Sequence, residues 1–225
     1  GYSAFAGRTE VEIPSALLNA EIVGQFLSLG GHTAYLYGYP PNTPILEPET
    51  CDQWGNLMLF LADDKGRIRA PMPTYYGSRL LTRTWAQPVN QLHRLYPASS
   101  NLNNDQGQSL VTAYAVYRPD HQWALMLINK SPQQDQSVTI RFLQSSDKEI
   151  AFLKGKLAIF QYSPKQYAWH SQGEQGYPTR SNPPEHFTIQ NAAASTPVTL
   201  PAYSLTIVRG QGPVPGDSIH PDPAP

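Results

Sequence analysis

Residues 110–129 read LVTAYAVYRPDHQWALMLIN, and this stretch decides the fold class of the second half of the chain. Leu110 to Arg118 and Gln122 to Asn129 are rich in β-branched, aromatic and other apolar residues, as β-strands are. The residues between the two runs, Pro119 to His121, have the chemistry of a turn. The stretch therefore predicts a β-hairpin.

The same pattern continues through the rest of the second half, from about residue 88 onward. Clusters of Pro, Gly, Asn and Asp separate further β-rich runs, which are Leu92 to Tyr96, Ser137 to Phe142, Gly155 to Tyr162, His186 to Gln190 and Ser204 to Arg209. With the hairpin they make seven strands, which predict a sandwich of two antiparallel sheets. Residues 212–225 are rich in proline and poor in large apolar residues, so we expect a disordered tail there.

The first 87 residues mix helix and strand patterns. Residues 14–29 carry apolar side chains at helical spacing and are followed by the pair Gly30–Gly31, so a helix is expected. His32 to Tyr39 predict a strand, and Pro73 to Trp85 predict a second helix. This order is typical of βα units, in which a helix with a broad apolar face lies on a sheet. One strand does not supply that sheet, so we expect further chain before Gly1.

The composition argues against several classes of function. The chain has 16 basic and 17 acidic residues among 225, a net charge of -1, and so lacks the positive surface that nucleic acid or an anionic membrane attracts. Cys51 is the only cysteine, and neither it nor His32 has a partner at metal-ligand spacing, so we expect no metal or other cofactor. Neutral polar residues dominate the surface, which is common in secreted proteins and favours an extracellular or periplasmic location.

The order of these segments resembles the end of a clan A (TIM-barrel) retaining glycoside hydrolase. In that clan the seventh barrel strand ends in the nucleophilic glutamate, and Gly1-Tyr2-Ser3-Ala4-Phe5 is similar to the residues that follow it. Residues 14–29 resemble the seventh helix, 32–39 the eighth strand and 73–85 the eighth helix. The ending Leu200 to Val208 resembles the last strand of the C-terminal sandwich that these enzymes often carry. The β-xylosidase and α-L-iduronidase families and the arabinofuranosidase and β-glucuronidase families are all similar in this way.

The resemblance implies a mixed fold, the end of a (β/α)₈ barrel followed by an antiparallel β-sandwich. The barrel's last βα units would occupy residues 1–87, the sandwich 88–211 and the tail 212–225. Both catalytic glutamates would precede Gly1, since a retaining enzyme carries them on its fourth and seventh strands. This chain would then hold no catalytic residue, would require the N-terminal barrel segment as its partner, and would not hydrolyse glycosides alone.

The resemblance also implies a set of substrate-binding residues, all of them aromatic. Tyr37 and Tyr39 would lie at the mouth of the barrel, where sugar rings stack on aromatic faces. Trp54 lies in the loop that follows, and Tyr2 would neighbour the nucleophile. For each of them, packing inside the barrel or under a loop is the alternative.

Acidic residues have alternative interpretations as well. Glu10 and Glu12 directly precede a helix, where a surface or capping role is expected. Glu47, Glu49 and Asp52 lie in a Pro-rich loop after the eighth strand. Both a surface role and contact with substrate are open for these three.

Two functions of other classes stay open. The sandwich could be a non-catalytic carbohydrate-binding module whose sugar-binding face contains Tyr162, Tyr167 and Trp169, or it could be a purely structural β protein. Packing between the sheets is the alternative interpretation of the three aromatic residues. Asn129-Lys130-Ser131 fits the N-glycosylation motif, which often arises by chance.

Overall fold

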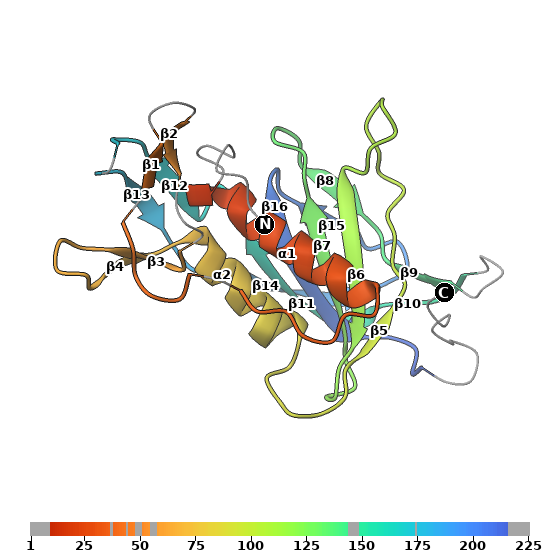
Figure 1. The fold of residues 1–225 in the computed structure, drawn as a ribbon. Coiled ribbons are helices and arrows are strands. Elements are labelled where there is room, and N and C mark those ends of the chain that lie inside the picture. The colour runs from red at the N-terminus through yellow and green to blue at the C-terminus, as the bar shows by residue number, and fades with distance from the viewer. Residues whose placement is uncertain are drawn as a thin grey trace.

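The fold is a mixed one in which strands outnumber helices. The computed structural model describes residues 10–36, 38–43, 45–47, 51–54, 58–143, 149–173 and 175–215, with the backbone alone for 45–47, 51–54, 149–150 and 152. Helix α1 (Ile13–Ser28) and helix α2 (Pro73–Arg79), which continues as the π-helical turns of η2 (Leu80–Trp85), lie side by side on one face of a sheet (Figure 1).

Both predicted helices are confirmed. Pro14 lies in the first turn of α1, where its missing N–H costs nothing. Gly30 has a φ of 88°, and the N–H of Gly31 donates to the carbonyl of Phe26 at 2.9 Å. A left-handed residue without a Cβ therefore ends the helix, as the glycine pair predicted. In the described part of the chain, no helix is long and apolar enough to cross a bilayer.

The central element is a six-stranded antiparallel sheet with the order β14-β11-β16-β7-β6-β5. Its strands are β5 (Arg94–Tyr96), β6 (Val111–Tyr117), β7 (Trp123–Asn129), β11 (Lys154–Tyr162), β14 (Glu185–Ala192) and β16 (Ser204–Gln211). The hairpin predicted from residues 110–129 is confirmed as β6 and β7. Arg118 N–H donates to the Gln122 carbonyl at 2.9 Å, and His121 adopts a φ of 60° in the turn.

The other strands form two-stranded sheets. These pairs are β1 (Ile45–Glu47) with β2 (Cys51–Trp54), β3 (Phe60–Ala62) with β4 (Ile68–Pro71), β8 (Gln136–Val138) with β15 (Val198–Leu200), β9 (Arg141–Leu143) with β10 (Glu149–Phe152), and β12 (Tyr167–His170) with β13 (Tyr177–Ser181). The β8–β15 and β9–β10 pairs lie on the face of the large sheet away from the helices (Figure 1). The second layer that the sequence predicted as one sheet is therefore divided into short pairs.

One hydrophobic cluster lies on each face of the six-stranded sheet. Side chains alternate along β7, so that Ala124, Met126 and Ile128 contribute to the cluster under the helices. Trp123, Leu125 and Leu127 contribute to the cluster under the short pairs. A third, smaller cluster of Val11, Met58, Leu61 and Met72 lies at the start of α1.

The strand predicted at His32 to Tyr39 is wrong for the residues of that stretch that are described. They have no regular secondary structure, and Tyr35 is 93% exposed. A strand needs a neighbour that accepts and donates its backbone hydrogen bonds. Here the Gly38 carbonyl accepts from Leu59 N–H at 2.9 Å and Asn42 bridges to Leu61, which attaches the segment to β3 only at its end.

The segment after β16 begins against the sheet. The carbonyl of Pro213 accepts a hydrogen bond from the Trp123 indole N–H at 2.8 Å. Residues 216–225, the rest of the expected tail, lie outside the described residues.

Candidate functional site

Of the four predicted substrate-binding residues, Tyr39 is the one whose side chain is described. Tyr2 and Tyr37 lie outside the described residues, and Trp54 is described by its backbone in β2. In the sequence, Tyr39 lies in the segment that connects α1 to β1, and its side chain is 74% exposed. It is the starting point for a site.

The backbone around Tyr39 is held on both sides. Before it, the Gly38 carbonyl accepts from Leu59; after it, Asn42 N–H donates to the Phe60 carbonyl at 3.1 Å. Asn42 also accepts from Ala62 N–H at 2.8 Å, and Pro40 and Pro41 fix two φ angles between these anchors. An exposed side chain is thus carried by a backbone with little freedom.

Tyr39 is the exposed end of a row of aromatic side chains, which we call the aromatic row. Successive ring centroids lie 6.3, 4.8, 5.2 and 5.3 Å apart, and the members in order are Tyr39, Phe60, Tyr75, Tyr76 and Tyr162. Phe60 meets Tyr39 at an interplanar angle of 88°, which is the favourable edge-to-face contact. Because Tyr162 is fully buried, the row joins the exposed ring to the core.

The other members of the aromatic row were not predicted as site residues. Phe60 comes from β3 and Tyr75 from α2. They meet because Met72 N–H and the Thr74 hydroxyl donate to the carbonyls of Leu59 and Met58, which fixes the start of α2 beside β3. Nothing in the local sequence pattern reports such a contact between elements.

Glu10 is a buried carboxyl group at the start of α1. It is 2% exposed, and neither carboxylate oxygen has a hydrogen-bond partner among the described residues. Burial raises the pKa of Glu10 from 4.5 to about 7. The predicted surface or capping role is therefore wrong for Glu10. The Glu12 side chain does not cap α1 either; the Ser15 hydroxyl donates to the Glu12 carbonyl at 2.7 Å.

Three other acidic residues named from the sequence belong to the segment after Tyr39. The backbones of Glu47 and Asp52 lie in the paired strands β1 and β2, and Glu49 lies outside the described residues. Their contact with substrate stays a prediction.

The aromatic residues considered for a sugar-binding face of the sandwich lie inside the protein. Tyr162 and Tyr167 are buried, and burial holds the pKa of both hydroxyl groups above the ordinary value. The Tyr167 hydroxyl contacts the sulfur of Met72 at 3.7 Å, and Trp169 packs against the core as a half-buried side chain. Packing is therefore the interpretation that the structure supports for these three residues.

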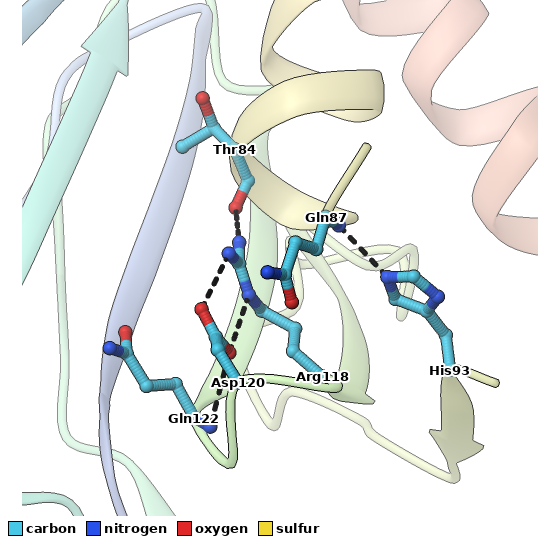
Figure 2. Close-up of polar contacts among 6 residues, drawn as sticks. All are labelled: Thr84, Gln87, His93, Arg118, Asp120 and Gln122. Carbon is cyan, nitrogen blue, oxygen red and sulfur yellow. Dashed lines mark hydrogen bonds and ion pairs between the residues drawn. The ribbon is translucent and has the colours of Figure 1, made fainter. Parts of the chain in front are cut away.

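An ion pair between the buried Arg118 and the partly exposed Asp120 lies at the far end of η2 (Figure 2). The Arg118 guanidinium donates to both carboxylate oxygens of Asp120, at 3.1 and 2.8 Å, and also to the Thr84 carbonyl. Burial of Asp120 acts to raise its pKa, but the hydrogen bonds and charge of Arg118 outweigh it and the pKa lies below the ordinary value. The pair connects the end of η2 to the β6–β7 turn. Nearby, the Gln87 N–H donates a hydrogen bond to the His93 ring.

Comparison with known proteins gives matches by structure. No family model and no curated protein matches the chain. Among solved structures, the family 30 endoxylanase of Clostridium papyrosolvens C71 matches with a TM-score of 0.53 and 13% identity, over 89% of this chain and 39% of that chain. The family 30 subfamily 8 xylanase of Clostridium acetobutylicum matches with a TM-score of 0.51 and 14% identity, over 89% and 40%. The fold is glycoside hydrolase-like. At such low sequence identities the match establishes a similar fold and nothing more. This chain spans about two fifths of the length of each xylanase chain.

Among the described residues, the aromatic row offers binding chemistry. An exposed tyrosine ring held edge-on by a second ring presents a flat apolar face and a hydroxyl group, the combination on which a sugar ring stacks. The Arg118–Asp120 pair, in contrast, uses its hydrogen bonds within the protein. We therefore take the Tyr39 end of the aromatic row as the candidate functional site.

Proposed function

We propose that this chain is the C-terminal segment of a clan A retaining glycoside hydrolase. Residues 1–87 are the last βα units of its (β/α)₈ barrel, and residues 88–211 are its accessory β-sandwich. The observation that carries the proposal is the match to two xylanase folds over 89% of this chain, while the chain covers 39% and 40% of theirs. The neighbouring helices α1 and α2, packed on a sheet, support it.

In this proposal the bond-breaking groups are supplied by the N-terminal barrel segment. A retaining glycosidase uses two carboxyl groups ~5 Å apart, one as nucleophile and one as acid and base. Both precede Gly1, so the chain alone does not hydrolyse glycosides. Its residues bind and orient the sugar, which raises the rate by holding the reacting atoms in place.

Tyr39 forms part of one wall of the sugar pocket, together with Tyr2, Tyr37 and Trp54. The support comes from the geometry of Tyr39 itself. Its exposed ring is braced by Phe60 and its backbone is held between Gly38 and Asn42, so little conformational freedom is lost when a sugar stacks on it. The substrate is a glycan or glycoside.

Substitution of Tyr39 tests this role. In the enzyme that contains both segments, Tyr39→Ala should raise KM for a glycoside about tenfold with a smaller change in kcat, because a lost stacking contact of ~1.4 kcal/mol is a factor of ten. Tyr35→Ala removes a still more exposed tyrosine from the same segment and should leave both constants unchanged. Equal effects of the two substitutions on KM would show that Tyr39 does not line the sugar pocket. Hydrolysis by this chain, purified free of any partner, would overturn the assignment of the catalytic groups.

A further inference from the structure

The outward side of α1 is apolar. Leu18, Ile22 and Phe26 are 38%, 49% and 42% exposed, and Leu29, directly after the helix, is 72% exposed. The three helical residues are four positions apart and so form one ridge along the helix. We call these four residues the outer stripe.

Polar residues of α1 hydrogen-bond to the sheet, although Gln25 and Ser28 are exposed. The helix has one charged residue, Glu21, which accepts a hydrogen bond from the Thr112 hydroxyl and lies 4.0 Å from the ammonium group of Lys130. Gln25 accepts a hydrogen bond from the Tyr114 hydroxyl at 3.3 Å. α1 is therefore apolar on its outward side as well as toward the core, whereas a surface helix ordinarily turns charged residues toward water.

Two other sides of α1 are already covered. Its inward face packs on the six-stranded sheet, where Gly24 lies so close that a Cβ would approach the Tyr114 ring to 2.7 Å. On one flank α1 meets α2. The helices are so close there that a Cβ added to Gly77 would lie 3.0 Å from the Cβ of Ala16. The outer stripe is therefore the side of α1 that the described residues leave uncovered.

We propose that the outer stripe packs against a helix of the N-terminal barrel segment of the same enzyme. This inference rests on the proposed function and names the surface through which the two parts join. The ridge of residues four apart fits the groove of a neighbouring helix, and the greater part of each matched xylanase chain lies outside the match, which covers 39% and 40%. The occupant is a further helix, packed on the outward side of α1.

The test compares a stripe variant with a matched control. The chain is co-expressed with the polypeptide encoded directly before Gly1, and the fraction that co-purifies is measured. Ile22→Gln with Phe26→Gln should lower that fraction at least about tenfold, since both side chains would lie at the centre of the contact. Leu92→Gln with Val214→Gln removes two exposed apolar residues elsewhere and should change it less than about twofold. All four side chains are exposed, so circular dichroism of the isolated variants should be that of the original chain.

A labelling experiment gives a second readout that does not depend on the yield of the complex. In a Cys51→Ser background, the thiol introduced by Ile22→Cys should react with a maleimide in the isolated chain and be protected in the co-expressed pair. The thiol introduced by Asp64→Cys, in the turn between β3 and β4, should react equally in both. Undiminished co-purification of the stripe variant, or labelling of the Ile22→Cys thiol in the pair, would overturn the proposal. So would an isolated chain that forms stable dimers which the stripe variant abolishes.

The glycoside assay on the same samples separates the two proposals. If the stripe variant still associates completely and the pair hydrolyses a glycoside, the proposed interface is wrong and the proposed function stands. If association depends on the stripe but the pair hydrolyses no glycoside, the proposed interface stands and the proposed function is wrong.

Discussion

The buried carboxyl group of Glu10 makes the stability of the protein depend on pH. Its pKa is about 7 in the folded state and 4.5 in the reference state, so the folded protein holds the proton more tightly. Stability is then fully present below about pH 4.5, falls as pH rises toward 7, and stays reduced above that. Glu10→Gln should raise the free energy of unfolding above about pH 8 by roughly 1–3 kcal/mol.

Urea unfolding measured at several pH values checks this prediction for Glu10. The curves of the original chain and of Glu10→Gln should converge near pH 4.5. A constant difference at all pH values would show that the carboxyl group does not titrate between the folded and unfolded states. Glu12→Gln serves as the control from the same segment.

Asn129 is a second residue with a definite structural role. Its amide NH₂ donates to the carbonyls of Gln134, Leu200 and Pro201, and its amide oxygen accepts from Ser131 N–H. The side chain is fully buried, so the Asn129-Lys130-Ser131 motif is not accessible for glycosylation in the folded protein.

Replacement of Asn129 should therefore be costly. Asn129→Ala leaves three carbonyls and one N–H without this partner and should lower the free energy of unfolding by about 2–5 kcal/mol. Asn101→Ala, at an exposed position, should change it by less than about 0.5 kcal/mol. Thermal unfolding of the two variants distinguishes these results, and a loss below about 1 kcal/mol for Asn129→Ala would contradict the network described.

Individual side chains were the least predictable part of the protein from sequence. Tyr39 was predicted as a site residue because it ends a β-like run that resembles the eighth barrel strand, yet its ring contact with Phe60 depends on how β3 packs beside α2. Val11, which follows the buried Glu10, belongs to a cluster with Met58 and Met72, residues about 50 and 60 positions away. Sequence periodicity reports contacts within an element, not contacts of this range.

At the scale of elements, α1 is fitted closely to the sheet by a glycine. Gly24→Ala would raise helix propensity by about 1 kcal/mol, but its Cβ would come within 2.7 Å of the Tyr114 ring. Tyr114 cannot move freely, because its carbonyl accepts from the Trp85 indole N–H and its hydroxyl donates to Gln25. The substitution should therefore destabilise the protein by about 1–3 kcal/mol.

Chemical unfolding of Gly24→Ala, with Ser28→Ala as an exposed control in the same helix, measures this effect. The control should change stability by less than about 0.5 kcal/mol. A variant that is more stable than the original chain would mean that propensity outweighs the contact and that α1 lies farther from β6.

Elements were predictable where the signal was local. Pro14 and Gly30 bound α1, and the turn at His121 joins two apolar strands, so these elements follow from a few neighbouring residues. His32 to Tyr39 have equally β-like residue types, but strand formation depends on a partner that the described chain supplies only at Gly38 and Asn42. Strands β12 and β13 were not predicted, because Pro178 and Arg180 weaken the strand pattern in the sequence. In the structure Pro178 pairs with Trp169 and Arg180 with Ala168, and this pairing forms the sheet.

At the scale of the whole molecule, the helices and the large sheet share one hydrophobic cluster. Ala16 and Ala20 of α1, Leu80 of η2, and Leu205 and Ile207 of β16 all belong to it. The order of helices followed by strands was predicted from sequence, and this joint core was not. It means that the two halves of the chain fold against each other even though the proposal assigns them to a barrel and a sandwich.

In the proposed function, this chain is part of a retaining glycosidase and supplies binding rather than bond cleavage. The most direct measurement is covalent trapping. The chain and the polypeptide encoded directly before Gly1 are incubated together with activated 2-deoxy-2-fluoro xylosides, glucosides and arabinofuranosides, and the attached sugar is located by mass spectrometry of the separated polypeptides. One sugar should be bound to a glutamate of the preceding polypeptide and none to this chain. A sugar bound to a carboxylate of this chain, or no trapped sugar with any of the three reagents, would contradict the proposed function.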